Sequence, residues 1–155
     1  MVQPIPRKKA ARTKVTKLSK VVKQKKAHPK YGTSKLEDYF ASNFLDVIGV
    51  KYIRQYEAKE IGRFYDFRIE NGPIIEVNGS YWHGDKRLYE EKDLNSTQKK
   101  NIYVDKLKQI WAENNGIEIY YFWEKDIREF PEQVMEQLKE IVKKYNKKCL
   151  KNGRH

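Results

Sequence analysis

Two apolar segments near the centre of the chain, residues 64–70 and 74–78, flank a turn that contains the pair Asn71-Gly72. An Asn-Gly pair between segments of strand composition is typical of a tight β-hairpin, because both residues tolerate the positive φ that such a turn requires. A further strand is expected just before the hairpin, at residues 52–57. The sequence therefore predicts three consecutive β-strands, of which the last two form a hairpin.

Helical patterns lie on both sides of these strands. Ser34 is expected to be the N-cap of a first helix, with Glu37 at its third position and Gly49 at its end. The apolar stripe of this helix consists of Leu36, Phe40, Phe44, Val47 and Ile48. A second helix is expected from a Ser96 cap to about Asn114, and its predicted buried face carries Tyr103, Leu107, Ile110 and Trp111.

The chain beyond residue 114 continues the alternation of strand and helix. Residues 117–123, IEIYYFW, are expected to form a central strand, and a last helix is expected to begin near Pro131. The order α-β-β-β-α-β-α is typical of an α/β domain with a mixed central sheet flanked by helices. Residues 79–97 lack a clear period and are expected to form a long loop, which in a compact domain is more often functional than idle.

Length and composition limit the class of protein. A chain of 155 residues suits one domain with an ordinary core. No apolar run is long enough to span a membrane, and the basic N-terminus is not followed by an apolar segment, so we expect neither a membrane span nor a secretory signal. The single cysteine, Cys149, has no partner for a disulfide or a cysteine zinc site, which suits an intracellular protein.

The positive charge is concentrated at the N-terminus. Residues 1–30 hold eleven of the 33 Lys and Arg residues and no acid, so the other 22 (33 less 11) nearly balance the 21 acids. Such a segment neutralises phosphates, so we expect residues 1–30 to be a flexible DNA-binding arm before a domain at residues 31–155. A solvated tail or a targeting signal is the alternative. The expected contacts are Arg7, Lys8, Lys9, Arg12, Lys14 and Lys17.

Three acids occupy positions that need an explanation. Glu37 lies at the edge of the first helix's apolar stripe, whereas Asp66 and Glu76 lie inside predicted strands. A buried carboxylate is costly unless it is paired or binds a cation, and oxygen ligands on neighbouring strands suit Mg²⁺. Alternation puts Phe64, Asp66 and Arg68 on one face of their strand, and Glu76 and Asn78 on one face of the next. Harmless pairing on a solvent-facing sheet is an equally open alternative.

His83, in the stretch NGSYWHGD, is the candidate general base. A neutral imidazole can accept a proton from water near pH 7, and a carboxylate on its other nitrogen would fix its tautomer. Asp105 is the candidate partner, because Asn101, Asp105 and Lys108 share a helical stripe beside the buried one. The alternative is a structural histidine and a surface acid.

Together these residues resemble a known family. The segments SKLED, VNGSYWHGD, KKNIYVDKL and NNGIEIYYFWE, with Asp66 between the first two, look like the very short patch repair (Vsr)-like endonucleases and the related EDxHD homing endonucleases. This group is a branch of the PD-(D/E)XK nuclease superfamily, whose core has the order predicted above. The resemblance covers residues 34–126. The GxxWH element and the KNxxxD…GxxxxxxWE spacing are moderately specific in combination.

The resemblance implies a role for each matching residue. Glu37 matches the glutamate of the family's first helix, and Asp66 matches its Mg²⁺-binding aspartate. Val77 falls where the family offers a backbone carbonyl to the metal. His83 matches the histidine that activates the attacking water, and Asp105 matches the aspartate that supports it. Tyr81 and Trp82 match an aromatic pair that wedges into DNA in the repair enzymes, although core packing is their alternative role.

The chain also departs from the repair enzymes. Their zinc ligands correspond here to Ser80, Asp85, Arg87 and Lys125, so no structural zinc is expected and mismatch recognition is in doubt. Glu76 is an extra acid at the position of the superfamily's ExK glutamate, and either its side chain or the Val77 carbonyl is the expected second metal ligand. Asn78 replaces the ExK lysine, which assigns the role of base to His83.

The expected function is a Mg²⁺-dependent endonuclease that nicks double-stranded DNA, acting as a monomer or a transient dimer on DNA. A free-standing mobile enzyme of the homing type, carried by a phage or a bacterium and active in the bacterial cytoplasm or nucleoid, suits the small size and the missing zinc. A mismatch-directed repair nickase is one alternative. An inert DNA-binding or architectural protein that keeps the fold and the basic arm is the other.

Overall fold

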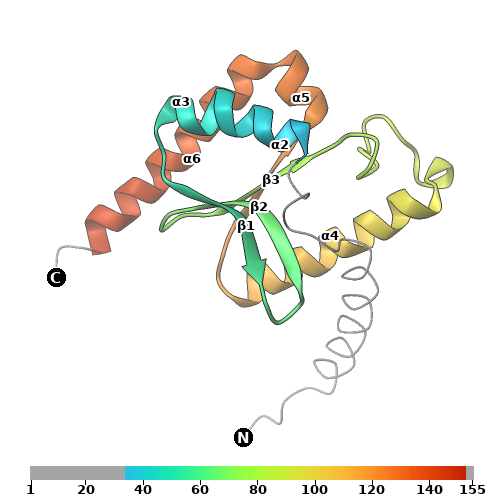
Figure 1. Cartoon of the computed structure of the whole chain (residues 1–155), viewed down its shortest axis with the longest axis horizontal. Helices are drawn as coiled ribbons and strands as arrows, with labels where there is room; N and C mark the ends of the chain where they lie inside the picture. The colour runs from blue at the N-terminus through green and yellow to red at the C-terminus, as the bar shows by residue number, and fades with distance from the viewer. Residues whose placement is uncertain (1–33, 153–155) are drawn as a thin grey trace, which may run out of the picture.

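The structure is a computed structural model that describes residues 34–152, with side chains described as far as Lys148. The basic arm, with Arg7, Lys8, Lys9, Arg12, Lys14 and Lys17, lies outside the described residues, as does the side chain of Cys149. The described part is an α/β fold in which helices cover both faces of a four-stranded mixed sheet (Figure 1). No helix among residues 34–152 is long and apolar enough to cross a membrane.

The sheet contains the four expected strands in the order β1-β2-β3-β4. Their bounds are β1 Tyr52–Ala58, β2 Arg63–Ile69, β3 Ile74–Asn78 and β4 Ile119–Trp123. The pairs β1-β2 and β2-β3 are antiparallel, whereas β3-β4 is parallel. The turn between β2 and β3 contains Asn71 at φ 55°, so the predicted hairpin is confirmed.

The prediction that residues 117–123 form a central strand was wrong. In the described sheet β4 pairs with β3 alone and lies at the edge. An apolar run indicates that both faces of a strand are covered, and helices do lie against both faces here (Figure 1). It does not indicate how many strands lie alongside, because ladder hydrogen bonds involve the backbone and not the side chains.

The first helix is continuous but changes its winding. It consists of α2 Lys35–Phe40, the π-helical segment η2 Ala41–Leu45 and α3 Asp46–Ile48. The Ser34 hydroxyl accepts a hydrogen bond from the Glu37 backbone N–H at 3.1 Å, and Gly49 ends the helix at φ 76°, as predicted. The wider π turn shifts the phase of the helix. Leu45 is therefore buried, and the prediction that Val47 faces inward was wrong, because Val47 is 66% exposed.

Helix α4 Ser96–Asn114 begins one residue earlier than the predicted Ser96 cap implies. Its N-cap is Asn95 rather than Ser96, because the Asn95 side chain accepts from the Gln98 backbone N–H while the Gln98 side chain accepts from the Asn95 N–H. The predicted buried face was also partly wrong, since Tyr103 and Ile110 are exposed. The side of α4 that faces the sheet carries Lys108 and Ala112 together with the predicted Trp111.

The end of the described chain contains two helices. Helix α5 Glu124–Glu129 follows β4 directly and was not predicted. Helix α6 Pro131–Asn152 begins at the predicted proline. Its inward residues Val134, Leu138 and Ile141 are buried, as the periodicity indicated. A short 3-10 helix, η3 Glu91–Asp93, lies within the segment that was predicted to be a long loop.

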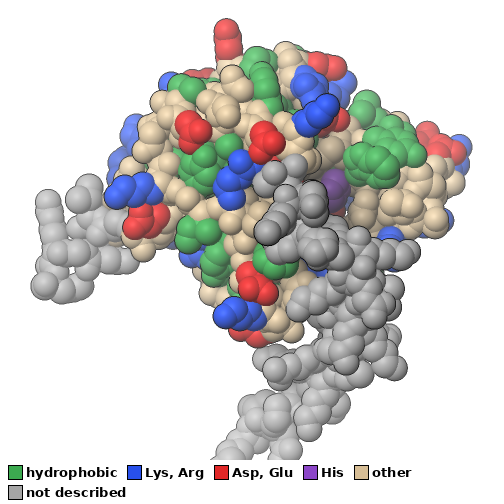
Figure 2. All heavy atoms as spheres, in the orientation of Figure 1, with side chains coloured by type: hydrophobic (Ala, Val, Ile, Leu, Met, Phe, Trp, Pro, Cys, Tyr) green, Lys and Arg blue, Asp and Glu red, His purple; other side chains and the backbone are tan. Residues whose placement is uncertain are grey.

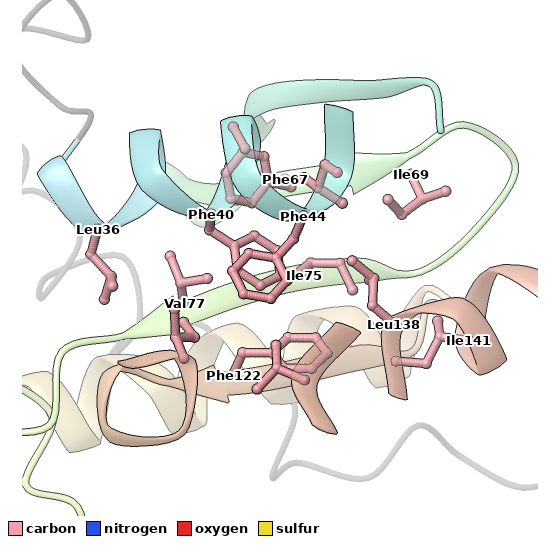
Figure 3. Packing of buried hydrophobic residues seen from close by; sticks show 14 residues of the cluster. Leu36, Phe40, Phe44, Phe67, Ile69, Ile75, Val77, Phe122, Leu138 and Ile141 are labelled. Atoms are coloured by element: carbon pink, nitrogen blue, oxygen red, sulfur yellow. The ribbon is translucent and has the colours of Figure 1, made fainter. Parts of the chain in front are cut away.

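Two apolar clusters hold these layers together. The larger lies between the sheet and the helices α2, η2 and α6, and Figure 3 shows its phenylalanines meeting from helix and strand. The Phe40 ring stacks on Phe44 at 5.1 Å and lies 5.3 Å from Phe122. The smaller cluster lies between the sheet and α4, and it includes Tyr65, Ile74 and Ala112.

Strand β2 contributes to both clusters, although its side chains were expected to alternate regularly. Tyr65 packs on the side of α4, whereas Phe67, two residues later, packs on the side of α2. Regular alternation would put both on one face. The prediction that Phe64, Asp66 and Arg68 share a face is therefore wrong, because the alternation breaks at Asp66. This break positions the candidate site.

Candidate active site

At the break in side-chain alternation, three residues lie in a row across the adjacent strands β1, β2 and β3. The register of β1 and β2 puts Gln55 opposite Asp66, and continuing the register of β2 and β3 puts Asp66 opposite Glu76. At this row, two backbone N–H groups of the strands donate to side-chain carboxylates and not to backbone carbonyls of the neighbouring strand. The Asp66 N–H donates to Glu76 Oε2 at 2.9 Å, and the Val77 N–H donates to Asp66 Oδ2 at 2.8 Å. The two predicted carboxylates are therefore fixed side by side by backbone donors.

Glu37 reaches the same place from α2. It is 7% exposed, and its Oε2 accepts a hydrogen bond from Gln55 Nε2 at 2.9 Å. Gln55 has φ 51°, an uncommon conformation for a residue other than glycine inside a strand. Such backbone strain is frequent at functional sites. The sequence contains no signal for this role of Gln55, because a glutamine in a strand is unremarkable by composition.

The three acids act on one another electrostatically. Burial raises the pKa of the Asp66 carboxyl well above its usual range, and the nearby charges of Glu76 and Glu37 raise it further. Burial also raises the pKa of Glu37, while its Ser34 hydrogen bonds and the Arg54 charge oppose that change. A cation bound among these carboxylates would stabilise their ionised forms.

Lys108 of α4 provides a cation at this site, and sequence reasoning missed it. Its Nζ forms an ion pair with Glu76 Oε1 and lies 4.6 Å from the centre of the Tyr65 ring. Burial by itself lowers the pKa of Lys108, but the charges of Glu76 and Asp66 more than compensate, so the pKa is raised. The available signal was the helical stripe that Lys108 shares with Asp105.

His83 and Asp105 are brought together as predicted. His83 Nδ1 lies 2.6 Å from Asp105 Oδ2, and both side chains are about one quarter exposed, at 26% and 24%. With the proton on Nδ1 directed at Asp105, Nε2 is the nitrogen that can accept a proton. Asp105 lies one helical turn before Lys108, and its charge contributes to the raised pKa of that lysine. One helix therefore supports both the histidine and the acid row.

The loop that carries His83 is fixed by the same helix. Gln98 Nε2 donates to the Tyr81 carbonyl at 2.7 Å, and Asn101 Nδ2 donates to the Trp82 carbonyl at 2.8 Å. Gly84 follows His83 at φ 58°, and a Cβ atom there would lie 2.8 Å from the Leu94 side chain. A glycine is therefore required immediately after the histidine.

Tyr81 and Trp82 lie at the surface beside the histidine. They are 47% and 58% exposed, so the alternative role of core packing is wrong for both. Their rings meet edge to face, with centroids 5.1 Å apart and an interplanar angle of 83°. Figure 2 shows a hydrophobic patch on the same face as the histidine of the described residues. This surface is suited to stacking against a planar partner.

Ser80, Asp85, Arg87 and Lys125, where no zinc site was expected from the resemblance, are part of a hydrogen-bonded network. The Lys125 N–H donates to Ser80 Oγ at 3.2 Å, and Arg87 Nη2 donates to the buried Asp85 at 2.7 Å. Arg87 Nη1 also donates to Asp126 at 2.8 Å. The Arg87 hydrogen bonds lower the pKa of Asp85. Asp85 therefore has a structural role: it holds Arg87, which in turn ties the loop to α5 through Asp126.

The residues present suit a magnesium ion by their chemistry. Mg²⁺ keeps several of its waters and needs only one or two protein carboxylates, which Asp66 and Glu76 supply from adjacent strands. Among residues 34–148, no three His, Cys, Asp or Glu side chains are close enough to hold one metal ion as they stand. The ion pair with Lys108 occupies one oxygen of Glu76.

The site therefore contains an acid row, a buried lysine and a histidine–aspartate pair beside an exposed aromatic pair. Comparison of the chain with family models, curated proteins and solved structures found no match.

Proposed function

We propose that this protein is a Mg²⁺-dependent DNA endonuclease of the PD-(D/E)XK type, similar to the very short patch repair and EDxHD homing endonucleases, and that it nicks double-stranded DNA. One observation carries the proposal: α4 holds Asp105 against His83 and, one turn later, holds Lys108 against Glu76 beside Asp66. A base and an acidic cation site that one helix holds in a fixed relation are suited to phosphodiester hydrolysis.

In the proposed reaction, His83 Nε2 accepts a proton from a water molecule as the water oxygen attacks phosphorus. The bond from phosphorus to the leaving oxygen breaks, and that oxygen takes a proton from solvent. Asp105 orients the imidazole and stabilises its protonated form. Asp66 and Glu76 would hold Mg²⁺, which when bound supplies positive charge to the phosphate oxygens. Glu37, held by Gln55, adds negative charge behind this pair and orders water beside it.

The DNA contacts are assigned by exposure and charge. Tyr81 and Trp82 protrude beside His83 and are proposed to unstack a base step, which costs a few kcal/mol and is offset by added contact. The basic arm of residues 1–30 would neutralise phosphates without reading sequence. One site per chain suits nicking by a monomer. A free-standing mobile endonuclease of the homing type is the setting we propose.

The test is relaxation of supercoiled plasmid by the full chain with and without Mg²⁺. We expect the wild-type protein to nick in Mg²⁺ and to stop on addition of EDTA. Asp66→Ala should abolish nicking, and His83→Ala should lower the rate by about 10²- to 10⁴-fold, the usual contribution of a general base. Glu91→Ala, which removes an exposed acid of η3, is the matched control and should nick at the wild-type rate. If Asp66→Ala and His83→Ala both nick plasmid at the wild-type rate, the assignment of these residues to the active site is refuted.

A further inference from the structure

Lys108 and Glu76 form the most buried ion pair among the described residues. Their side chains are 12% and 5% exposed, whereas every other pair in the described chain has at least one partner more exposed. Burying two charges costs several kcal/mol per ion before their attraction is counted. Such a buried pair is stable only if nearly all of its polar atoms have hydrogen-bond partners, and both oxygens of Glu76 do.

Both oxygens of Glu76 have partners in this arrangement. Oε1 contacts the Lys108 ammonium, and Oε2 accepts from the Asp66 N–H at 2.9 Å. Asp66 in turn uses Oδ2 to accept from the Val77 N–H at 2.8 Å. The Lys108 ammonium therefore lies close to the carboxylates of Glu76 and Asp66. A second cation bound to the same carboxylates would be repelled by its positive charge. A metal ion that takes Glu76 Oε1 must first separate that oxygen from Lys108.

We propose that Lys108 is an internal counter-ion that competes with divalent metal for Glu76. It holds the acid row together in the metal-free protein and is displaced from Glu76 when the metal binds. The inference rests on the proposed function for the place of the metal, but it concerns metal affinity and not cleavage.

The displaced ammonium has other partners nearby. The Tyr65 ring lies under Lys108 Nζ at 4.6 Å, and a cation over an aromatic face is stabilised without a carboxylate. The Tyr65 hydroxyl also donates to the Lys108 carbonyl at 2.6 Å, which fixes the ring and the helix relative to each other. Lys108 can therefore release Glu76 by rotating its side chain while the backbone of α4 stays in place.

The first experiment measures binding of Mn²⁺ alone to the full chain by electron paramagnetic resonance. Lys108→Met keeps the length of the side chain and removes the charge, so we expect it to bind Mn²⁺ about tenfold more tightly or better, since metal affinity depends on the net charge of the site. Lys108→Arg keeps the charge and should bind as the wild type does. Lys106→Met, an exposed lysine on the same helix, is the matched control and should leave the affinity unchanged.

The outcomes separate the two proposals. Unchanged or weaker Mn²⁺ binding by Lys108→Met would overturn the counter-ion role, whatever the plasmid assay shows. Tighter binding in that variant, in a protein that fails to nick plasmid, would support the counter-ion role and count against the endonuclease. A merely structural ion pair predicts lower stability without a gain in affinity.

A second measurement uses the wild-type chain and does not depend on the Met variant folding. The side-chain ammonium of Lys108 is observed by NMR in protein labelled with ¹⁵N-lysine, and its signal is assigned by its disappearance in Lys108→Arg. Saturating Mg²⁺ should move this signal, while those of exposed lysines such as Lys106 stay in place. A Lys108 signal that does not move at saturating Mg²⁺ would refute displacement.

Discussion

At Asp66, the protonation state that the fold favours differs from the one that the proposed reaction needs. Its carboxylate is enclosed with two other acids, and its raised pKa means that ionisation is disfavoured in the folded protein. The proposed chemistry needs the ionised form. A bound cation would resolve the conflict, and without one the fold carries an electrostatic cost at this residue.

We expect Asp66→Asn to abolish nicking and to stabilise the metal-free protein at neutral pH. The asparagine oxygen can still accept from the Val77 N–H, whereas the buried charge is removed. Because the folded-state pKa of Asp66 is raised, the wild type loses stability as pH rises from the ordinary value near 4 through that raised pKa. At high pH, the variant should gain about 1.4 kcal/mol in free energy of unfolding for each unit by which the folded-state pKa of Asp66 exceeds its unfolded-state pKa.

Denaturant unfolding in metal-free buffer from pH 4 to pH 8 checks this prediction. The gain should be largest at high pH and should vanish toward pH 4, where both proteins are neutral at this position. Asp93→Asn, which changes an exposed acid of η3, is the control and should show no such trend. A variant less stable than the wild type at pH 8 would contradict the account.

At the residue scale the sequence predicted which side chains lie together better than it predicted their backbone geometry, and their chemical roles stay a prediction. The positions of Glu37, Asp66 and Glu76 in apolar segments indicated a cluster of acids, and the helical stripe that contains Asp105 indicated the partner of His83. Gln55 and Lys108 were not found. Their roles depend on a positive φ in β1 and on which side of α4 faces the sheet, and neither can be read from residue type.

Helix α4 is the element that positions the site. Its N-terminal half binds the carbonyls of the histidine loop through Gln98 and Asn101, and its middle presents Asp105 and Lys108. The start of this helix therefore affects both stability and the placement of the loop. Its N-cap is the position where these effects can be measured with the least disturbance.

We expect Asn95→Ala to lower the free energy of unfolding by about 1 kcal/mol, because the cap hydrogen bond to the Gln98 N–H is lost. Nicking should also weaken, since the Asn95 side chain donates to the Tyr81 hydroxyl at 3.1 Å. Ser96→Ala, at the cap predicted from sequence, is the control and should change stability by a few tenths of a kcal/mol at most. Chemical denaturation of both variants measures this, and a larger loss for Ser96→Ala would place the cap at Ser96.

The elements themselves were largely predictable, and their boundaries and phases were not. Asn95 and Ser96 are both good caps, so the choice between them depended on the Gln98 side chain. The π-helical turn in the first helix moved Val47 outward, and no pattern in the sequence marks such a turn. The position of β4 at the sheet edge depended on backbone pairing, which side-chain periodicity does not report.

The whole chain divides by charge into a strongly basic arm and a nearly neutral remainder. Residues 1–30 contain eleven basic residues and no acid, and the chain has a net charge of +12. DNA affinity that comes from neutralised phosphates falls steeply with salt, because each contact releases counterions. We therefore expect the arm to determine how the proposed enzyme responds to ionic strength.

We expect deletion of residues 1–30 to weaken DNA binding at low salt and to flatten the dependence of log affinity on log salt concentration. The slope should fall by about one for each lost phosphate contact. Fluorescence anisotropy with a labelled duplex at several salt concentrations measures this, and Lys147→Gln in α6 serves as a control for the loss of one exposed positive charge. An unchanged slope after the deletion would refute the role of the arm.

The break in alternation at Asp66 also links the site to the folding of the molecule. Strand β2 sends Tyr65 into one apolar cluster and Phe67 into the other, with Asp66 between them. Loss of either cluster would release one end of this short segment and let the carboxylate rotate toward water. We therefore expect the acid row to persist only while both halves of the core are intact, so that no partly unfolded state retains the proposed cation site.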